Sequence, residues 1–295
     1  MRSGTMRLGG GYLEKIVDLD PFVLPFDLIL PGRDPNALLP HADLLSPDHV
    51  DFEGGNLLLS LHSFLLKIGG LTILIDTCVG EHKPRPRRAD WNARTDTAYL
   101  AGLAAAGVRP EDVDIVMCTH LHADHVGWNT RLEGGRWVPT FPKARYLIGA
   151  AELAHWQAEE ARAPGAANHG AYTDSVLPVI EAGLVERVED GFSLGRGMAI
   201  TGLAGHAPGQ IGLDLDCGNG SHAHFCGDAF HSPVQVYHPD WSSRFCHDPA
   251  LAAALRTRLL AEAAENDTLL LPAHLRNAFG MRIRRAGAGF RPALS

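Results

Sequence analysis

The sequence is poor in cysteine and has no long apolar run. Its five cysteines are odd in number and form no C-x-x-C pair, which excludes a disulfide framework and a cysteine-type zinc finger. The longest apolar stretch, Leu57–Ile75, is interrupted by histidine, lysine and a glycine pair, so it is too polar to span a membrane. The first twenty residues lack the apolar core of a secretory signal. We therefore expect a soluble, cytoplasmic protein without a membrane partner.

Positive charge is also scarce. The 26 lysines and arginines are outnumbered by 34 aspartates and glutamates, which gives a net charge of −8. Binding to nucleic-acid phosphates is disfavoured by this acidic balance, so we expect no nucleic-acid partner. With 45% hydrophobic and 20% charged residues, the chain has the composition of a packed globular protein.

Strand-like and helix-like segments alternate along the chain. Their order favours a single α/β domain over residues 51–295. Residues 1–50 are rich in proline, glycine and aspartate, and we expect an irregular N-terminal arm that packs on this domain or on a dimer partner. The polar, proline-rich segment 81–91 is predicted to be a surface loop. The predicted strands are 57–66, 71–76, 113–118, 144–148, 198–203, 211–216, 222–226 and a final one at 268–271, and the predicted helices are 99–104, 151–162 and 249–265.

Sixteen histidines are the unusual feature of the composition, and three of them lie in one short segment. This segment, THLHADH at residues 119–125, follows a predicted strand. In a tight loop or a first helical turn, its first two histidines can converge on one point, and its aspartate and last histidine on a second point nearby. Imidazole nitrogen and carboxylate oxygen suit zinc or a similar divalent ion. The alternative is a polar helix start with exposed histidines. The four candidate ligands are His120, His122, Asp124 and His125.

Three further candidates each follow a predicted strand. His206 lies in the segment GHAPG, Asp228 in CGD and His274 in LPAH. The small neighbouring residues allow the backbone to turn tightly and point each side chain inward. Taken singly, each is more typical of a capping or core polar residue. Together with the first segment they supply five histidines and two aspartates, which is enough for a two-metal site.

The motifs H-x-H-x-D-H, G-H-x-P-G, G-D and a final histidine occur here in the order found in the metallo-β-lactamase-fold hydrolases, and residues 57–275 resemble this superfamily. The resemblance implies a four-layer αββα sandwich with two divalent metal ions, zinc being expected and manganese or iron(II) being alternatives. Asp76 matches a strand-end aspartate that orients a ligand histidine in the family. The implied ligand set is His120, His122 and His206 for one ion, Asp124, His125 and His274 for the other, and Asp228 as the bridge between them.

Asp228 also favours some branches of the superfamily over others. β-Lactamase subclasses usually carry cysteine or serine near this point, whereas lactonases and parathion-hydrolase-like phosphotriesterases keep the aspartate. The segment DAFHSPVQ, residues 228–235, is similar to those two branches. The resemblance therefore implies a hydrolase that opens a small ester or lactone, such as an acyl-homoserine lactone, with a hydroxide that bridges two metal ions.

The alternatives concern both the substrate and the presence of catalysis. The main activity can instead be that of a phosphotriesterase, an arylesterase or a β-lactamase, and outside the enzymes the chain can be a metal-binding protein. His231 lies three residues after Asp228 and either assists the reaction, through a hydrogen bond or a proton, or is structural. The catalytic candidates are Asp124, Asp228 and His231. The apolar N-terminal arm makes a homodimer one expected form.

Overall fold

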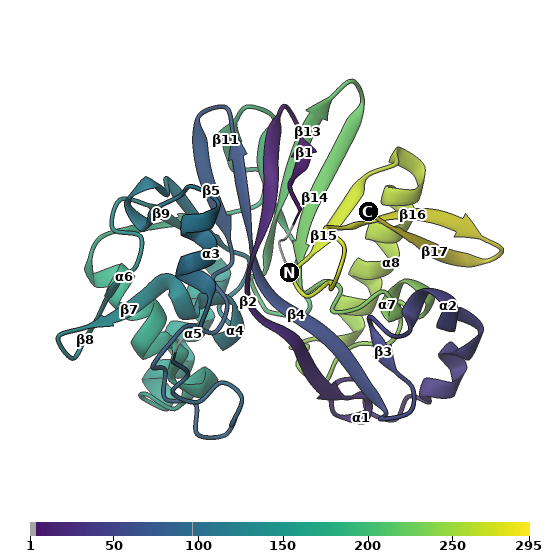
Figure 1. Ribbon diagram of the computed structural model, residues 1–295, viewed down its shortest axis with the longest axis horizontal. Coiled ribbons are helices and arrows are strands. Elements are labelled where there is room, and N and C mark those ends of the chain that lie inside the picture. The colour runs from purple at the N-terminus through teal and green to yellow at the C-terminus, as the bar shows by residue number, and fades with distance from the viewer. Residues whose placement is uncertain (1–3, 96) are drawn as a thin grey trace. The chain divides into compact units, whose positions relative to one another are not determined.

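The computed structural model describes residues 4–95 and 97–295, and these form two compact units (Figure 1). The first unit contains the chain up to Asp18 together with Leu61–Asp190. The second unit contains Leu19–Ser60 and Gly191–Ser295. Two mixed sheets with flanking helices make up the structure, so the predicted α/β class is confirmed.

The elements of the first unit follow the chain in the order β1 (Met6–Leu8), β2 (Gly11–Pro25), β4 (Asn56–Ile68), β5 (Leu71–Ile75), α3 (Tyr99–Ala105), η2 (Pro110–Asp112), β6 (Ile115–Cys118), α4 (Ala123–Val126), η3 (Gly127–Asn129), β7 (Thr130–Glu133), β8 (Arg136–Pro139), β9 (Arg145–Gly149), α5 (Ala150–Arg162), η4 (Ala167–Gly170), η5 (Tyr172–Val176), α6 (Leu177–Glu181) and β10 (Val185–Val188). Strands β2 and β4 continue into the second unit.

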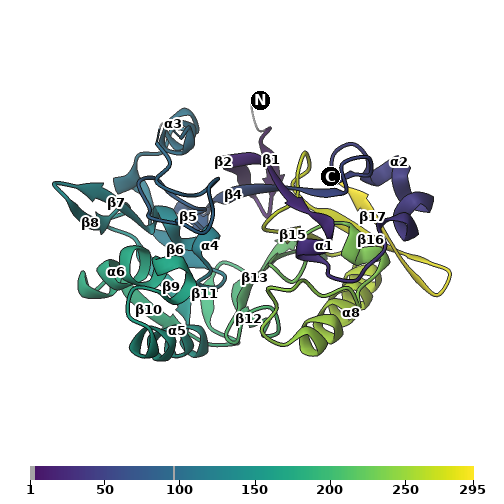
Figure 2. The same ribbon diagram turned by 90° about the horizontal axis from the view of Figure 1, so that it is seen from below.

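The sheet that runs through this unit has the strand order β1-β2-β4-β5-β6-β9-β10. β4 and β5 form an antiparallel hairpin whose turn is Gly69-Gly70, with φ of 55° and 82°, a backbone conformation that glycine adopts without strain. β5 and β6 are parallel, so Asp76 and Thr119, which follow them, lie at the same edge of the sheet. Helix α5 packs beside β9 and β10 (Figure 2).

The elements of the second unit are α1 (Phe26–Ile29), η1 (Pro35–His41), α2 (Ala42–Leu45), β3 (Val50–Asp51), β11 (Ser193–Gly195), β12 (Met198–Gly202), β13 (Ile211–Gly218), β14 (Ser221–Gly227), α7 (Val234–Tyr237), α8 (Pro249–Asn266), β15 (Leu269–Pro272), β16 (Met281–Ala286) and β17 (Gly289–Leu294). Its sheet runs from β11 to β17 in chain order.

Helix α8 covers this second sheet and forms the core of the unit with it. Asp248 caps the helix by accepting hydrogen bonds from the backbone N–H groups of Ala250 and Leu251. The buried face of the helix packs against the sheet through apolar residues such as Leu259 and Met281. β14 and β15 are parallel and joined by this helix, so the residues that follow them, Asp228 and His274, lie at one edge of the sheet.

Three expectations about the chain are wrong. Residues 11–25 are not irregular but form the long strand β2, in which Leu13, Ile16, Phe22 and Leu24 are buried, and the interrupting proline and aspartates hid this pattern. The strand at 269–272 is not the last, because the arginine-rich hairpin β16–β17 follows it. Segment 81–91 is not wholly at the surface, because two of its cations are fully buried against a carboxylate distant in sequence. The packing of residues 1–50 on the domain or on a partner stays a prediction.

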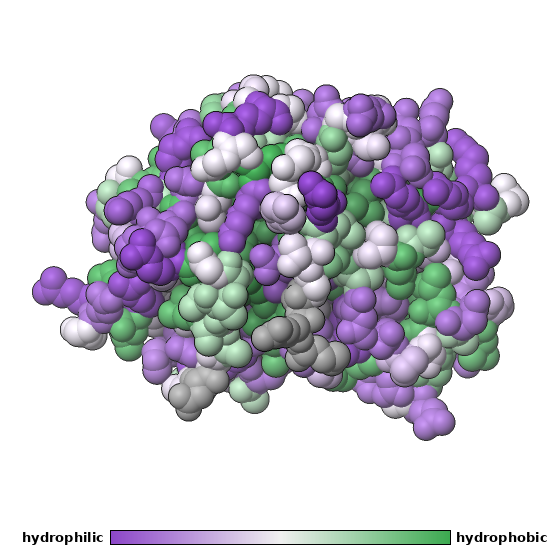
Figure 3. Space-filling view, turned by 45° about the horizontal axis from the view of Figure 1, so that its top comes forward, coloured by the Kyte–Doolittle hydropathy of each residue, from purple (hydrophilic) through white to green (hydrophobic). Residues whose placement is uncertain are grey.

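The surface carries hydrophilic residues spread among hydrophobic ones, as Figure 3 shows for one face of the molecule. Large exposed hydrophobic residues come from separate elements, for example Tyr12 from β2, Leu132 from β7 and Leu251 from α8. Among residues 4–95 and 97–295, no helix is long and apolar enough to cross a membrane.

Candidate metal centre

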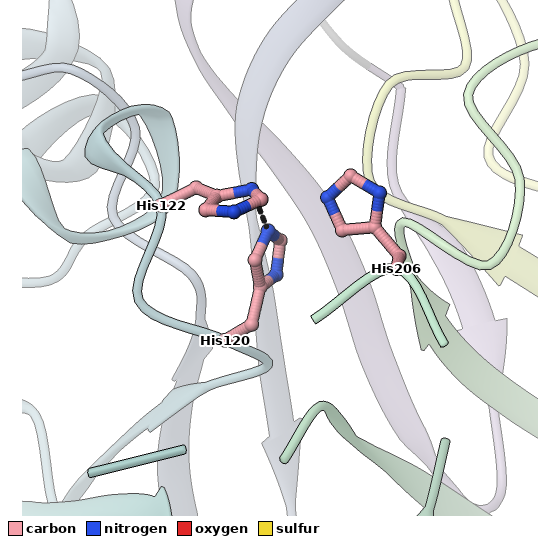
Figure 4. Close-up of side chains that lie close together, drawn as sticks. All are labelled: His120, His122 and His206. Atoms are coloured by element: carbon pink, nitrogen blue, oxygen red, sulfur yellow. Dashed lines mark hydrogen bonds between the residues drawn. The ribbon is translucent and has the colours of Figure 1, made fainter. Parts of the chain in front are cut away.

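The H-x-H-x-D-H segment forms a loop and a short helix at the end of β6. Because β6 ends at Cys118 and α4 begins at Ala123, the residues between them turn sharply. His120 and His125 are buried, whereas His122 and Asp124 are half-buried. The Nε2 atom of His120 lies 3.0 Å from the Nδ1 atom of His122, and the two rings meet nearly at right angles (Figure 4). The two ring nitrogens therefore face each other, as two ligands of one ion would.

One ring nitrogen of His120 and one of His125 each contact another side chain. The Nδ1 atom of His120 lies 3.1 Å from the hydroxyl of Thr119, and the Nδ1 atom of His125 lies 2.9 Å from a carboxylate oxygen of Asp76. Asp76 also accepts hydrogen bonds from the backbone N–H and the hydroxyl of Thr119. The Nε2 atom of His125 lies 3.9 Å from the Asp124 carboxylate. The buried Asp76 is thus in contact with the His125 ring, and its role in orienting a metal ligand stays a prediction.

In the second unit, three histidines surround one buried carboxylate. The Asp228 oxygens lie 3.4 Å from Nε2 of His206, 3.3 Å from Nε2 of His231 and 3.1 Å from Nε2 of His274. His206, which Figure 4 also draws, follows β12, while Asp228 follows β14 and His274 follows β15. The loops that end these strands therefore bring together the predicted ligands of this unit.

The histidines of the second unit also contact supporting groups, of which Gln235 alone lies in a segment quoted in the sequence analysis. Nδ1 of His206 lies 3.7 Å from the thiol of Cys246, and Nδ1 of His274 lies 3.2 Å from the carbonyl oxygen of Ser60. The backbone N–H of His231 donates to the side-chain oxygen of Gln235 at 2.7 Å. Sequence reasoning missed these supporting residues because no local spacing marks them, apart from the four-residue separation of His231 and Gln235.

The spacing of the donor atoms provides a test of whether a metal fits. In a tetrahedral site with zinc–ligand bonds of 2.0–2.1 Å, neighbouring ligand atoms lie roughly 3.3 Å apart. The nitrogen pair of His120 and His122 is 3.0 Å apart, and the Asp228 carboxylate lies 3.3 to 3.4 Å from His231 and His206. All of these donors are nitrogen or oxygen atoms, which first-row divalent ions accept. The group His206, Asp228 and His231 therefore fits a divalent metal ion, and the pair His120 and His122 has the spacing of two ligands of one ion.

His231 is not among the expected metal ligands, but it lies as close to Asp228 as one of them does. Its side chain is 4% exposed, and its Nε2 atom is as close to Asp228 as that of the predicted ligand His206. Neither ring nitrogen of His231 makes a hydrogen bond with a described residue. A buried imidazole with both nitrogens available can bind an ion, donate a proton or accept one.

The chain belongs to the metallo-beta-lactamase superfamily, because the family model matches residues 58–274, about three quarters of its length. A comparison with curated proteins gave no match. The family assignment and the buried histidine and aspartate groups define a metal-dependent hydrolase of this superfamily.

Solved structures with the same fold include two hydrolases and a further lactonase. Hydrolase AbOPH of the beta-lactamase superfamily is 23% identical, with a TM-score of 0.81 over 100% of this chain and 98% of its own. AidC, a dizinc quorum-quenching lactonase in complex with a product, is 19% identical, with a TM-score of 0.78 over 100% and 97%. A mutant of AiiA from B. thuringiensis, with N-decanoyl-L-homoserine at its active site, is 16% identical, with a TM-score of 0.60 over 93% and 94%. These likenesses confirm the predicted fold.

Proposed function

We propose that the protein is a dinuclear metal-dependent hydrolase that opens a small ester or lactone, with an acyl-homoserine lactone as the first substrate to test. The observation that carries the proposal is the two-sided arrangement of the histidines. In each of four histidines, one ring nitrogen contacts a supporting group and the other faces a nitrogen or oxygen atom of another candidate ligand. These four are His120, His125, His206 and His274. This arrangement is typical of metal ligands and not of histidines that merely fill a core.

The proposed ligand set is the one that the resemblance to the superfamily implies. It follows the order of ligands in the superfamily and is supported within each unit by the distances given above. The proposed ligands are His120, His122 and His206 for one ion, Asp124, His125 and His274 for the other, and Asp228 for both. Zinc is the first candidate metal, because the donor set is nitrogen and oxygen and because the structural neighbour AidC is a dizinc enzyme.

Two bound divalent ions supply a field that polarises a carbonyl oxygen and lowers the pKa of a bound water molecule to about 7. The remaining steps depend on the residues of this chain. The carboxylates of Asp124 and Asp228 accept and relay the proton of the attacking water. We propose that His231, whose Nε2 atom lies 3.3 Å from the Asp228 carboxylate, donates a proton to the leaving alkoxide.

The lactone proposal is supported by the neighbours AidC and AiiA, whose structures hold a lactonase product and an acyl-homoserine, respectively. With two divalent ions bound, the site would carry a net positive charge, which suits several acyl and phosphoryl substrates. We therefore propose the ester or lactone as the main substrate, with the phosphotriester, the aryl ester and the β-lactam as the comparison set.

The test combines metal content with turnover. We expect about two metal ions per chain by elemental analysis, together with lactone opening that chelation abolishes and added zinc restores. Asp228→Ala is expected to lose turnover while it keeps its fold. Asp43→Ala, which removes an exposed carboxylate of the same unit, is the matched control and keeps full activity.

Three outcomes would count against parts of the proposal. Fewer than one metal per chain after reconstitution would refute the metal centre. Two metals per chain without lactone opening, but with faster hydrolysis of phosphotriesters, would show that phosphotriesters and not lactones are the main substrate class. Wild-type turnover in Asp228→Ala would refute the role of this carboxylate.

A further inference from the structure

The short stretch around His122 is held by side chains from a distant part of the chain. The carboxylate of Glu152 accepts a hydrogen bond from the backbone N–H of Leu121 at 3.0 Å, across 31 residues of sequence. The amide of Asn168 makes two bonds to the same stretch. Its oxygen accepts from the backbone N–H of Ala123 at 3.1 Å, and its NH2 group donates to the carbonyl oxygen of Leu121. All of these residues belong to the first unit.

The position of the two Asn168 bonds is specific. The carbonyl of Leu121 belongs to the peptide group that precedes His122, and the N–H of Ala123 belongs to the peptide group that follows it. One amide side chain therefore fixes both peptide groups that flank this histidine. A residue held at both flanking peptides has little freedom to move its Cα atom, so the direction of its side chain is set before any ligand binds.

Asn168 reaches this position through an unusual backbone conformation. Asn168 and His169 have positive φ values of 49° and 57°, in the left-handed region that asparagine tolerates better than most residues. The guanidinium of Arg85 donates to the carbonyl oxygen of His169 at 3.0 Å, and Arg85 is itself paired with Asp174. A buried ion pair thus anchors the turn that points the Asn168 amide at the histidine loop.

We propose that Asn168 is a positioning residue that pre-organises His122 for metal binding by clamping its two flanking peptide groups. The proposal rests on the function proposed above in so far as His122 is taken as a metal ligand. The clamp itself is a property of the metal-free chain. Supporting residues of this kind typically change metal affinity by 10–100-fold when they are replaced.

The test uses the full chain with Asn168→Gly, which removes the clamp and is free of strain at this positive φ. The matched control is Asn219→Gly, which replaces an exposed asparagine that has a φ of 54° in the turn between β13 and β14. We expect the zinc affinity of Asn168→Gly, measured by competition with a chromophoric chelator, to fall at least about 10-fold. Asn219→Gly is expected to bind zinc as the wild type does.

A second measurement separates the clamp from the proposed function. In metal-free protein, amide hydrogen exchange followed by NMR is expected to become at least about 10-fold faster at Ala123 in Asn168→Gly, because its N–H loses its acceptor. Leu121, which Glu152 still holds, is expected to change less. The melting temperature of the metal-free variant is expected to stay near that of the control.

Each outcome bears on one of the two proposals. If the wild type binds no zinc, the proposed function fails, and the exchange rate at Ala123 still decides whether the clamp exists. Unchanged exchange at Ala123 in Asn168→Gly would overturn the clamp. Faster exchange with unchanged zinc affinity would overturn its role in positioning a metal ligand.

Discussion

Replacing Asp174 by asparagine tests how much stability the first unit draws from one buried ion pair. Arg85 and Asp174 make two parallel hydrogen bonds, of 2.6 and 2.8 Å, and their side chains are 0% and 6% exposed. In Asp174→Asn the guanidinium of Arg85 stays buried without a compensating charge. Breaking a buried pair in this way costs about 3–5 kcal/mol, most of it the cost of the charge left unpaired. We expect a loss of this size in the free energy of unfolding.

Lys83 makes the stability of the first unit depend further on Asp174. Its ammonium is fully buried, lies 3.8 Å from the same carboxylate and sits over the ring of Trp137 at 3.6 Å. Burial lowers the pKa of Lys83 from its usual 10.5 to about 7, although the charge of Asp174 raises it. Between these two pH values the unfolded chain holds a proton that the folded chain has lost, so stability rises with pH across this window. In Asp174→Asn the pKa of Lys83 falls further, so the pH range over which stability rises begins below pH 7.

The assay is urea unfolding at pH 7 and at pH 9, followed by fluorescence and circular dichroism. The matched control is Asp112→Asn, because Arg109 and Asp112 form a similar two-bond pair whose side chains are 75% and 38% exposed. Exposed pairs contribute little, so the control is expected to unfold close to the wild type. A loss below about 1 kcal/mol in Asp174→Asn, or a loss equal to that of the control, would refute the argument that burial sets the cost.

Three further substitutions test contacts of the first unit. Asp76→Asn is expected to weaken zinc binding by about 10–100-fold in a chelator competition, because His125 loses its charged partner, and wild-type affinity would show that Asp76 does not support this ligand. Gly127→Ala is expected to destabilise the protein by more than about 2 kcal/mol in thermal unfolding, because the added Cβ would lie 1.9 Å from the carbonyl oxygen of Val79. Gly102→Ala, in helix α3 with only Ile16 nearby at 3.5 Å, is expected instead to stabilise it by about 0.5–1 kcal/mol; equal melting temperatures for the two variants would contradict this reasoning.

The sequence predicts those parts of the fold that are marked by residue patterns within a short segment. The hairpin of β4 and β5 is marked by its glycine pair, and helix α8 by the aspartate and proline at its start. The candidate ligands of each unit are likewise marked by short motifs directly after strands. Such signals depend on neighbours within a few residues, and these are visible without a structure.

The supporting contacts are not local and could not be predicted. Ser60 meets His274 across 214 residues, Arg85 meets Asp174 across 89, and nothing in either segment marks the partner. The buried cations in segment 81–91 show the same limit, since a polar composition predicts exposure unless the distant carboxylate is known. Long-range pairing therefore decides which polar residues enter the interior of this protein.

The two units support their histidines with groups of different strength. In the first unit, the single carboxylate of Asp76 accepts from Thr119, whose hydroxyl meets His120, and also lies against His125. One buried charge therefore orients two histidines that are assigned to different ions. In the second unit, the partners are a neutral carbonyl, of Ser60, and a thiol, of Cys246, at a longer distance. Because charge-assisted hydrogen bonds are roughly twice as strong as neutral ones, Asp76 gives His125 a stronger partner than the Ser60 carbonyl gives His274. Within the first unit, one buried carboxylate thus supports, directly or through Thr119, two histidines that we propose as ligands of different ions.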